Sequence, residues 1–345
     1  AYFDEVHVLV LIPRSGEADV ERRQDNVWIY QAYHPAGQLV SAAVAVADQH
    51  LIFNGSARPD VIVGIDPFAA GQAAYEIAAA FERPLQLHLF TNPLDQHWID
   101  TEKGRNAAAR QARRLLKRVA SVRTKTDLMK AQLTETFRNL TDVAVLPQHY
   151  DFAGFKAATP TFDVHERYPG YAVLMLAIGP LTADSYLHDT FTALNRTLTN
   201  RRIGLIVLGE GPAKHLFVEK AELLGITEQV MFVSDFTNLI SYIKTADLLV
   251  VTDTSADSEI NVLRAASAGL PCVMYRTDLR EDLFKDGVSA LFAEPGNTVA
   301  VAKQVQSFIN LVTMRRQLSR NSRAVADARL HEDLQSYFLA IQQTI

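Results

Sequence analysis

A polar loop between two apolar runs holds the side chains best suited to chemistry. The run at 248–251 leads into the loop, and a second run at 271–275 follows a helical pattern that begins at Glu259. Strand, loop, helix and strand form a βαβ unit. Such a unit places its loop at the carboxyl edge of a parallel sheet, where open α/β folds bind ligands near a helix amino terminus. We therefore predict a ligand site at 252–259, with Asp257 and Glu259 as candidate catalytic carboxylates.

A glycine-containing turn is the second candidate site. Gly209-Glu210-Gly211-Pro212 follows the apolar run 203–208 and opens a helical pattern, so its backbone amides could approach a phosphate, aided by the helix dipole. The third glycine of a dinucleotide fingerprint is replaced by Lys214, which excludes a nicotinamide site. The alternative interpretation is a tight turn between strand and helix. Lys214, Ser258 and Arg264 are the further candidates for phosphate binding; for Arg264 the alternative is a solvent-facing position on a helix.

Strand-like and helix-like segments alternate along both halves of the chain. This alternation predicts an α/β fold of two doubly wound domains, with a ligand in the cleft between them. A chain of 345 residues is long enough for two domains at about 150 residues each. The periodicity lapses at 155–168, a segment that reads as a linker. We therefore predict domains at 1–165 and 166–330, and a final helix at 331–345 that packs back toward the first domain.

Composition excludes several classes of protein. The formal net charge is -5 and the pI is near 6.1, which argues against a nucleic-acid binder, whose domains are usually basic. The single cysteine, Cys272, rules out a disulfide framework and a cysteine-ligated metal site, and it fits a reducing cytoplasm. The histidines show no metal-ligand spacing, so no metal is expected. No apolar run approaches the roughly 18 residues of a membrane span, and we predict a cytoplasmic protein.

A basic helix is predicted at 101–119. Six cations lie between Arg105 and Arg118, around a thin apolar stripe. Arginines on a surface helix are common, which favours a solvated outer face. The alternative is a patch for peripheral contact with acidic lipid head groups.

A series of motifs in the second half resembles one enzyme family. The series is Gly209-Glu210-Gly211-Pro212, Leu224-Gly225-Ile226, Gln229-Val230-Met231-Phe232, Ala246-Asp247-Leu248-Leu249-Val250, Ala265 to Val273, Asp286-Gly287 and Pro295-Gly296-Asn297. In order and spacing these motifs resemble the carboxyl-terminal domain of retaining nucleotide-sugar glycosyltransferases of the group 1, family 4 type. Looser matches in the first half include Pro59-Asp60-Val61-Ile62 and Val145-Leu146-Pro147-Gln148.

The resemblance implies the GT-B architecture, in which two Rossmann-like domains face a cleft. It also implies a UDP or GDP sugar as donor substrate, no tightly bound cofactor, and a glycan, lipid or protein acceptor.

The family's donor-site motifs are degenerate in this chain. The family places an arginine and a lysine where Pro180 and Ser185 stand here, and it carries two glutamates at the positions of Ala256 and Arg264. A family histidine that approaches the sugar matches Phe90, although His88 lies two residues away and is the third catalytic candidate. A diphosphate brings about two negative charges, and each charge-assisted contact contributes roughly 1.5–3 kcal/mol. Loss of both cations therefore weakens donor binding about a thousandfold.

The family's first strand also has no counterpart in this sequence. That strand is central in a doubly wound sheet, so without it the first domain's sheet is expected to open in the middle unless another segment or chain fills the gap.

Two hypotheses follow from the degenerate motifs. The first is a non-catalytic partner or acceptor-binding subunit of an active glycosyltransferase, or a homo-oligomer with that role. The second is an active glycosyltransferase with a rearranged donor site, in which Asp257 or Glu259 supplies the carboxylate and Lys214 or Arg264 binds phosphate.

Overall fold

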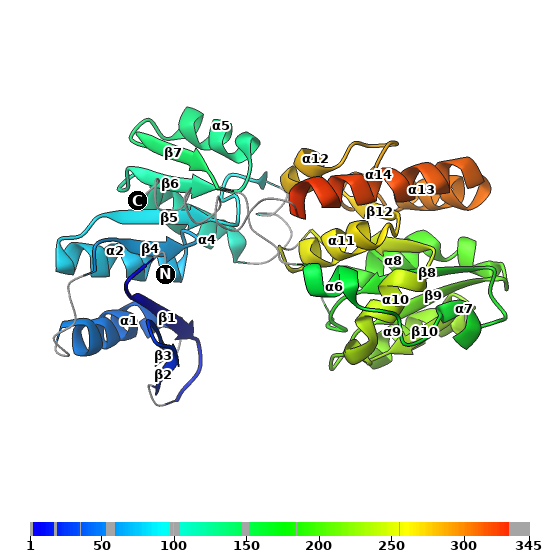
Figure 1. Ribbon diagram of the computed structural model, residues 1–345, viewed down its shortest axis with the longest axis horizontal. Helices are drawn as coiled ribbons and strands as arrows, with labels where there is room; N and C mark the ends of the chain where they lie inside the picture. Colours follow the sequence, from blue (N-terminus) through cyan, green and yellow to red (C-terminus); the bar gives the residue numbers. More distant parts are fainter. Residues whose placement is uncertain are drawn as a thin grey trace. The chain divides into compact units, whose positions relative to one another are not determined.

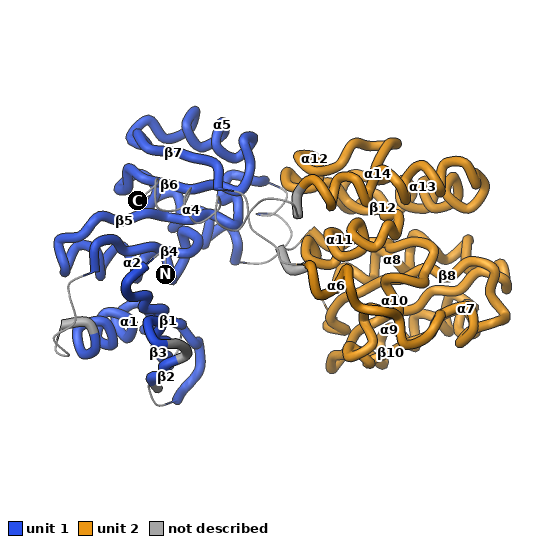
Figure 2. The backbone as a smooth tube through the Cα atoms, in the orientation of Figure 1, with its two compact units in different colours: residues 1–148, 333–345 blue, residues 149–332 orange. Residues whose placement is uncertain are grey.

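The computed structural model describes residues 3–16, 19–34, 36–52, 59–96, 99, 104–146, 152–183, 185–254 and 256–330. These residues form two compact units, one within Ala1–Gln148 and the other within His149–Glu332 (Figure 2). The predicted helix at 331–345 lies outside the described residues.

The second unit is built on a six-stranded parallel sheet of order β10-β9-β8-β11-β12-β13 (Figure 1). Its strands are β8 (Val173–Ile178), β9 (Ile203–Leu208), β10 (Val230–Val233), β11 (Leu248–Val251), β12 (Cys272–Tyr275) and β13 (Leu291–Ala293). Side chains on the two faces of each strand enter two different cores: Val173 and Met175 enter one, Leu174 and Leu176 the other. Because both faces are covered, the strands are continuous apolar runs rather than alternating ones.

Helices form a layer on each face of this sheet. The helices are α6 (Ala153–Ala157), α7 (Val164–Arg167), α8 (Leu187–Leu194), α9 (Lys214–Leu223), α10 (Leu239–Thr245), α11 (Ala256–Ala268), α12 (Asp278–Leu283), α13 (Thr298–Asn310) and α14 (Val312–Leu330). Phe191 of α8, Phe217 of α9 and Phe308 of α13 fill the core on one face. Tyr242 of α10 and Val262 of α11 fill the core on the other. The result is the three-layer α/β arrangement that the alternating pattern predicts.

The segment predicted as a linker contributes to the second unit's core. Phe152, just before α6, is 5% exposed and Val164 in α7 is fully buried, and both pack with residues of β8, β9 and β11. The division between the units therefore falls at 148/149, earlier than the predicted boundary near 165. Short helices in place of a regular pattern explain why the periodicity lapsed there.

The first unit contains two separate sheets. A parallel sheet of order β4-β5-β6-β7 consists of β4 (Ile62–Ile65), β5 (Leu85–Leu89), β6 (Ser121–Thr124) and β7 (Asp142–Val145). A smaller sheet of order β1-β3-β2 consists of β1 (Val6–Ile12), β2 (Asp19–Gln24) and β3 (Val27–Tyr33). The helices are α1 (Leu39–Ala47), α2 (Ala69–Phe81), α4 (Arg105–Leu116) and α5 (Asp127–Thr136), and α1 continues into a π-helical turn at Asp48–Ile52.

The hairpin strand β2 was not expected from the sequence. Its residues are mostly charged or polar, so it lacks an apolar pattern, and it pairs antiparallel with β3 through backbone hydrogen bonds. Charged residues are typical of an edge strand, where they discourage pairing with other chains.

The edges of β1 and β4 are open. Among the described residues β1 pairs only with β3, and β4 pairs only with β5. Both strands nevertheless lie under one helical layer, because Leu9 of β1 and Ile62 of β4 pack on the same cluster from α1 and α2. Val10 in β1 and Ile65 in β4 remain 39% and 48% exposed. Among the described residues the two sheets of this unit are therefore separate but share one helical layer.

Amide hydrogen exchange tests the open edges. Peptides from β4 are expected to exchange faster than peptides from β5, since among the described strands β4 is paired on one side and β5 on both. Mass spectrometry of the full chain measures both, with β9 as an internal reference for full protection. Equal protection of β4 and β5 would show that another strand covers this edge in solution.

Candidate functional site

The carboxyl edge of the second unit's sheet contains the predicted site. The strand order reverses between β8 and β11, the first and fourth strands along this unit, and such a switch point is where open α/β sheets bind ligands. The loops that follow these two strands are joined by hydroxyl groups. Thr252 Oγ1 donates to the carbonyl oxygen of Tyr186 at 2.7 Å and lies 2.8 Å from Thr190 Oγ1. The predicted loop 252–259 therefore lies at the expected edge of the sheet.

The glycine turn packs against the loop after β8. A Cβ atom on Gly209 would lie 2.0 Å from the carbonyl oxygen of Gly179, and one on Gly211 would lie 2.3 Å from that of Leu181. The backbones are hydrogen-bonded as well, since Leu181 N donates to the carbonyl oxygen of Glu210 at 2.8 Å. Only glycine permits this approach. The tight-turn interpretation accounts for both glycines, while Glu210, Pro212 and Lys214 remain exposed at the start of α9.

A fully buried arginine organises the other side of the edge. Arg280 of α12 is 0% exposed, and its Nη2 donates to the carbonyl oxygen of Asp253 and to Ser258 Oγ, both at 2.7 Å. Its Nη1 donates to the carbonyl oxygen of Tyr275 at 2.7 Å. Its Nε lies 3.2 Å from Glu259 Oε1. One guanidinium thus joins the loop after β11, the end of β12 and the first turns of α11.

This arrangement gives Glu259 and Ser258 structural partners. Glu259 is 4% exposed, and besides Arg280 it accepts a hydrogen bond from Thr277 Oγ1 at 3.2 Å. Ser258 is 5% exposed. Neither side chain faces open solvent, so the geometry does not favour the predicted contact of Glu259 with a sugar or of Ser258 with a phosphate. The side chains of Ala256 and Asp257 lie outside the described residues.

The remaining donor-side candidates lie in different environments. Pro180 is exposed, whereas Ser185 is 7% exposed and its Oγ accepts a hydrogen bond from Leu187 N at the start of α8. Arg264, in the third turn of α11, lies with its guanidinium carbon 6.0 Å from the centre of the Phe152 ring. Burial lowers the pKa of Arg264. Its contacts are those of a packed helix residue, and no described contact joins it to the glycine turn.

In the first unit, His88 and Phe90, the two residues compared with the family's sugar-contacting histidine, lie at the end of β5. His88 Nε2 is 2.6 Å from Gln86 Oε1, and burial, assisted by the charge of Arg123, lowers the His88 pKa to about 4. The ring is therefore neutral at physiological pH. Phe90 presents its ring to the ammonium group of Lys125 at 5.6 Å.

Two site residues were missed by the sequence reasoning. The first is Arg280, whose position in a short helix carries no motif. The second is Asp66, directly after β4, which has a positive φ of 59° and accepts hydrogen bonds from Phe90 N at 2.7 Å and Thr91 N at 2.8 Å. Burial raises the pKa of Asp66, although these hydrogen bonds by themselves lower it. Asp66 joins the loops after β4 and β5, and an aspartate at the end of an apolar strand was the only available signal.

Comparison with protein families identifies the class. The family model of glycosyl transferases group 1 matches residues 166–325, and that of the glycosyl transferase 4-like domain matches residues 4–149. The two matches together span most of the chain, and the chain belongs to the group 1 glycosyltransferases. This confirms the predicted resemblance to group 1 glycosyltransferases.

Solved structures confirm the GT-B fold. HepE from Anabaena, crystallised with UDP, matches with a TM-score of 0.70 at 16% identity over 92% of this chain and 85% of its own. Sucrose-phosphate synthase from Thermosynechococcus elongatus matches with a TM-score of 0.79 at 14% identity over 98% of this chain and 88% of its own. N-acetyl-alpha-D-glucosaminyl L-malate synthase from Bacillus anthracis is 21% identical over 137 residues, which is 40% of this chain. That match spans 36% of the relative's length.

The described residues offer neither a metal-binding group nor a membrane-spanning helix. Among the described residues, no three histidine, cysteine or acidic side chains form a group that could hold a metal ion. The helices seen in the described ranges are too short or too polar to cross a membrane.

Substitution of Arg280 tests its structural role. Arg280→Met leaves the buried Glu259 carboxylate without its ion pair, and we expect the free energy of unfolding to fall by about 3–5 kcal/mol. The double variant Arg280→Met/Glu259→Met is expected to recover much of this loss, because it removes the stranded charge. Urea denaturation measures both. Additive losses in the double variant would contradict a coupled pair.

Acid titration tests the environment of His88. An unfolded histidine binds a proton below pH about 6.5, whereas folded His88 does so only near pH 4, so His88 lowers stability as pH falls through this range. We expect His88→Gln to lose less stability than the wild type between pH 6.5 and 4.5 in urea denaturation. Parallel losses in both proteins would show that the ring titrates normally.

Proposed function

We propose that this protein is a non-catalytic group 1 glycosyltransferase relative that serves as a partner or acceptor-binding subunit of an active glycosyltransferase. The observation that carries the proposal is the state of Glu259. Glu259 lies in the sequence between the family's two carboxylate positions, Ala256 and Arg264, and both of its oxygens are occupied inside a buried network with Arg280 and Thr277.

The carboxylate positions support this proposal. The resemblance expects glutamates where Ala256 and Arg264 stand. Alanine lacks the negative charge of a glutamate, and arginine carries the opposite charge. Repositioning Glu259 toward a sugar would leave the buried Arg280 charge unpaired, which costs several kcal/mol. A rearranged site built on Glu259 is therefore unfavourable.

The cations of the same edge support it as well. Pro180 and Ser185 replace the arginine and lysine that would neutralise a diphosphate. Arg280 is buried against Glu259, and Arg276, at the end of β12, contacts Glu281 at 2.5 Å, Asp286 at 2.7 Å and Glu294 at 2.9 Å. In the described part of this edge, both arginines already face carboxylates.

The second candidate is an active transferase with a rearranged donor site. It is favoured by the retained turn Gly209–Pro212 and by HepE, which has been crystallised with UDP and also with UDP-glucose. In this case phosphate is bound by Lys214, which is exposed, or by Arg264, and Asp257 supplies the carboxylate. The reaction transfers the sugar of a UDP or GDP donor, with retention, to a glycan, lipid or protein acceptor.

Calorimetric titration with UDP, GDP, UDP-glucose and GDP-mannose, with and without magnesium, separates the candidates. We expect the wild-type chain to show no micromolar binding. Pro180→Arg/Ser185→Lys restores the family's two cations and is expected to strengthen UDP binding about a hundredfold or more, since each charge-assisted contact contributes roughly 1.5–3 kcal/mol.

A matched control adds the same two charges elsewhere on this unit. Leu223→Lys/Val299→Lys places them at positions that are 88% and 78% exposed, and it should leave UDP binding unchanged. Micromolar binding of a nucleotide sugar by the wild type, together with release of the free nucleotide during incubation with it, would contradict the non-catalytic proposal and establish the second candidate.

A further inference from the structure

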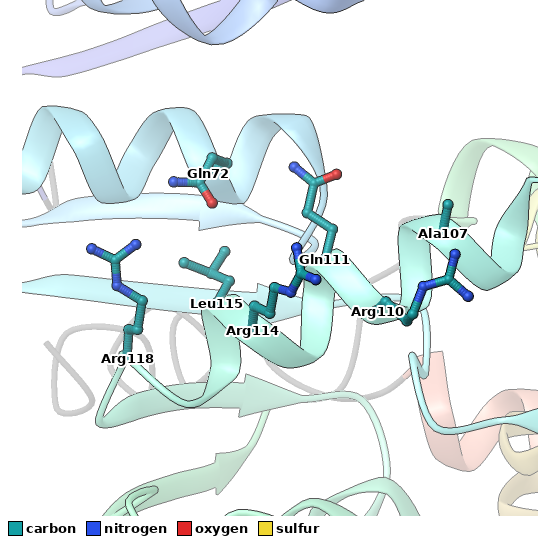
Figure 3. Close-up of a pocket in the computed structure, with 7 residues that line it drawn as sticks. All are labelled: Gln72, Ala107, Arg110, Gln111, Arg114, Leu115 and Arg118. Carbon is teal, nitrogen blue, oxygen red and sulfur yellow. The ribbon is translucent and has the colours of Figure 1, made fainter.

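The first unit contains a groove lined by three arginines. It lies between α2 and α4, has a volume of about 510 Å³, and is lined by Gln72, Ala107, Arg110, Gln111, Arg114, Leu115 and Arg118. Figure 3 shows Gln72 reaching down from α2 while Gln111, Arg114 and Arg118 reach up from the α4 side into the same space. The volume is within the range of ordinary ligand pockets, about 300–1,000 Å³.

The arginines are spaced along the α4 side of the groove. Arg110 and Arg114 lie four residues apart on α4 and therefore on one helix face, and Arg118 follows four residues later, just beyond the end of α4. Arg118 is held in place by Tyr75 of α2, whose ring centre lies 4.2 Å from the guanidinium carbon. The side chains of Arg110 and Arg114 are exposed.

The positive charge of the groove is not compensated by its lining. The segment 105–118 has six cations and no acidic residue. In the described part of the chain, no carboxylate pairs with Arg110, Arg114 or Arg118. On α2, Glu76 accepts a hydrogen bond from Gln72 Nε2 at 2.8 Å. Like charges at this spacing repel one another, so an anion in the groove would stabilise the arrangement.

We propose that this groove is a binding site for a phosphate-bearing polyanion. Arginine is suited to phosphate because its planar guanidinium presents paired donors to the phosphate oxygens. The amides of Gln72 and Gln111 add neutral donors beside the three charges. All residues that line the groove belong to the first unit.

The ligand is a discrete phosphorylated molecule rather than a membrane surface. A helix that lies on a membrane exposes large apolar side chains beside its cations. In α4 the large apolar residues, Leu115 and Leu116, are buried within the unit, and the exposed apolar residue, Ala107, is small. The cations line a concave groove, which fits a compact polyanion such as the phosphorylated part of an acceptor.

The first arm of the test uses inorganic tripolyphosphate and the full chain. Hydrogen exchange with mass spectrometry is expected to show protection of peptides from α4 when tripolyphosphate is added at moderate ionic strength. Arg110→Gln/Arg114→Gln is expected to lose this protection and to bind at least about tenfold more weakly. Lys117→Gln removes a neighbouring charge that does not line the groove, and it should behave as the wild type. Thermal unfolding confirms that each variant is folded.

The second arm uses vesicles of phosphatidylcholine with and without phosphatidylglycerol. We expect that Arg110 and Arg114 contribute nothing to any sedimentation of the protein with the anionic vesicles. Protection of α4 that persists in the double variant would overturn the proposal. So would sedimentation that depends on these arginines without protection by tripolyphosphate, because it would assign the groove to a lipid surface.

Discussion

The buried guanidinium of Arg280 is the interaction on which the donor-side edge depends. A charge removed from water costs several kcal/mol unless every donor is satisfied. Arg280 meets this requirement by drawing together two backbone carbonyl groups, a hydroxyl and a carboxylate from the loop after β11, the end of β12 and the start of α11. The loop positions at this switch point follow from that requirement. The Glu259 carboxylate is thereby held between Arg280 and Thr277.

The glycine turn at this edge is likewise explained by backbone packing. Gly209 and Gly211 are required because the backbone after β9 touches the backbone after β8, whether or not a phosphate binds. A GT-B protein can therefore keep this turn for packing reasons alone, because the close approach of the two backbones requires glycine at both positions.

The first unit departs further from a regular doubly wound domain. Its strands are divided between two sheets, and a charged antiparallel hairpin extends the smaller one. The helical layer of α1 and α2 continues across the division, which is why the unit stays compact although β1 and β4 have open edges.

The sequence by itself determined the strands of the second unit and the family. Runs such as Ile203–Leu208 are apolar at every position because both faces are buried, and such runs are recognisable without a structure. The polar strand β2 of the first unit could not be recognised in this way, because its pairing is made by the backbone and leaves no apolar pattern. The site itself required the tertiary structure. Arg280 and Glu259 are 21 positions apart and Asp66 and Thr91 are 25 apart, so only the folding of the chain could bring them together.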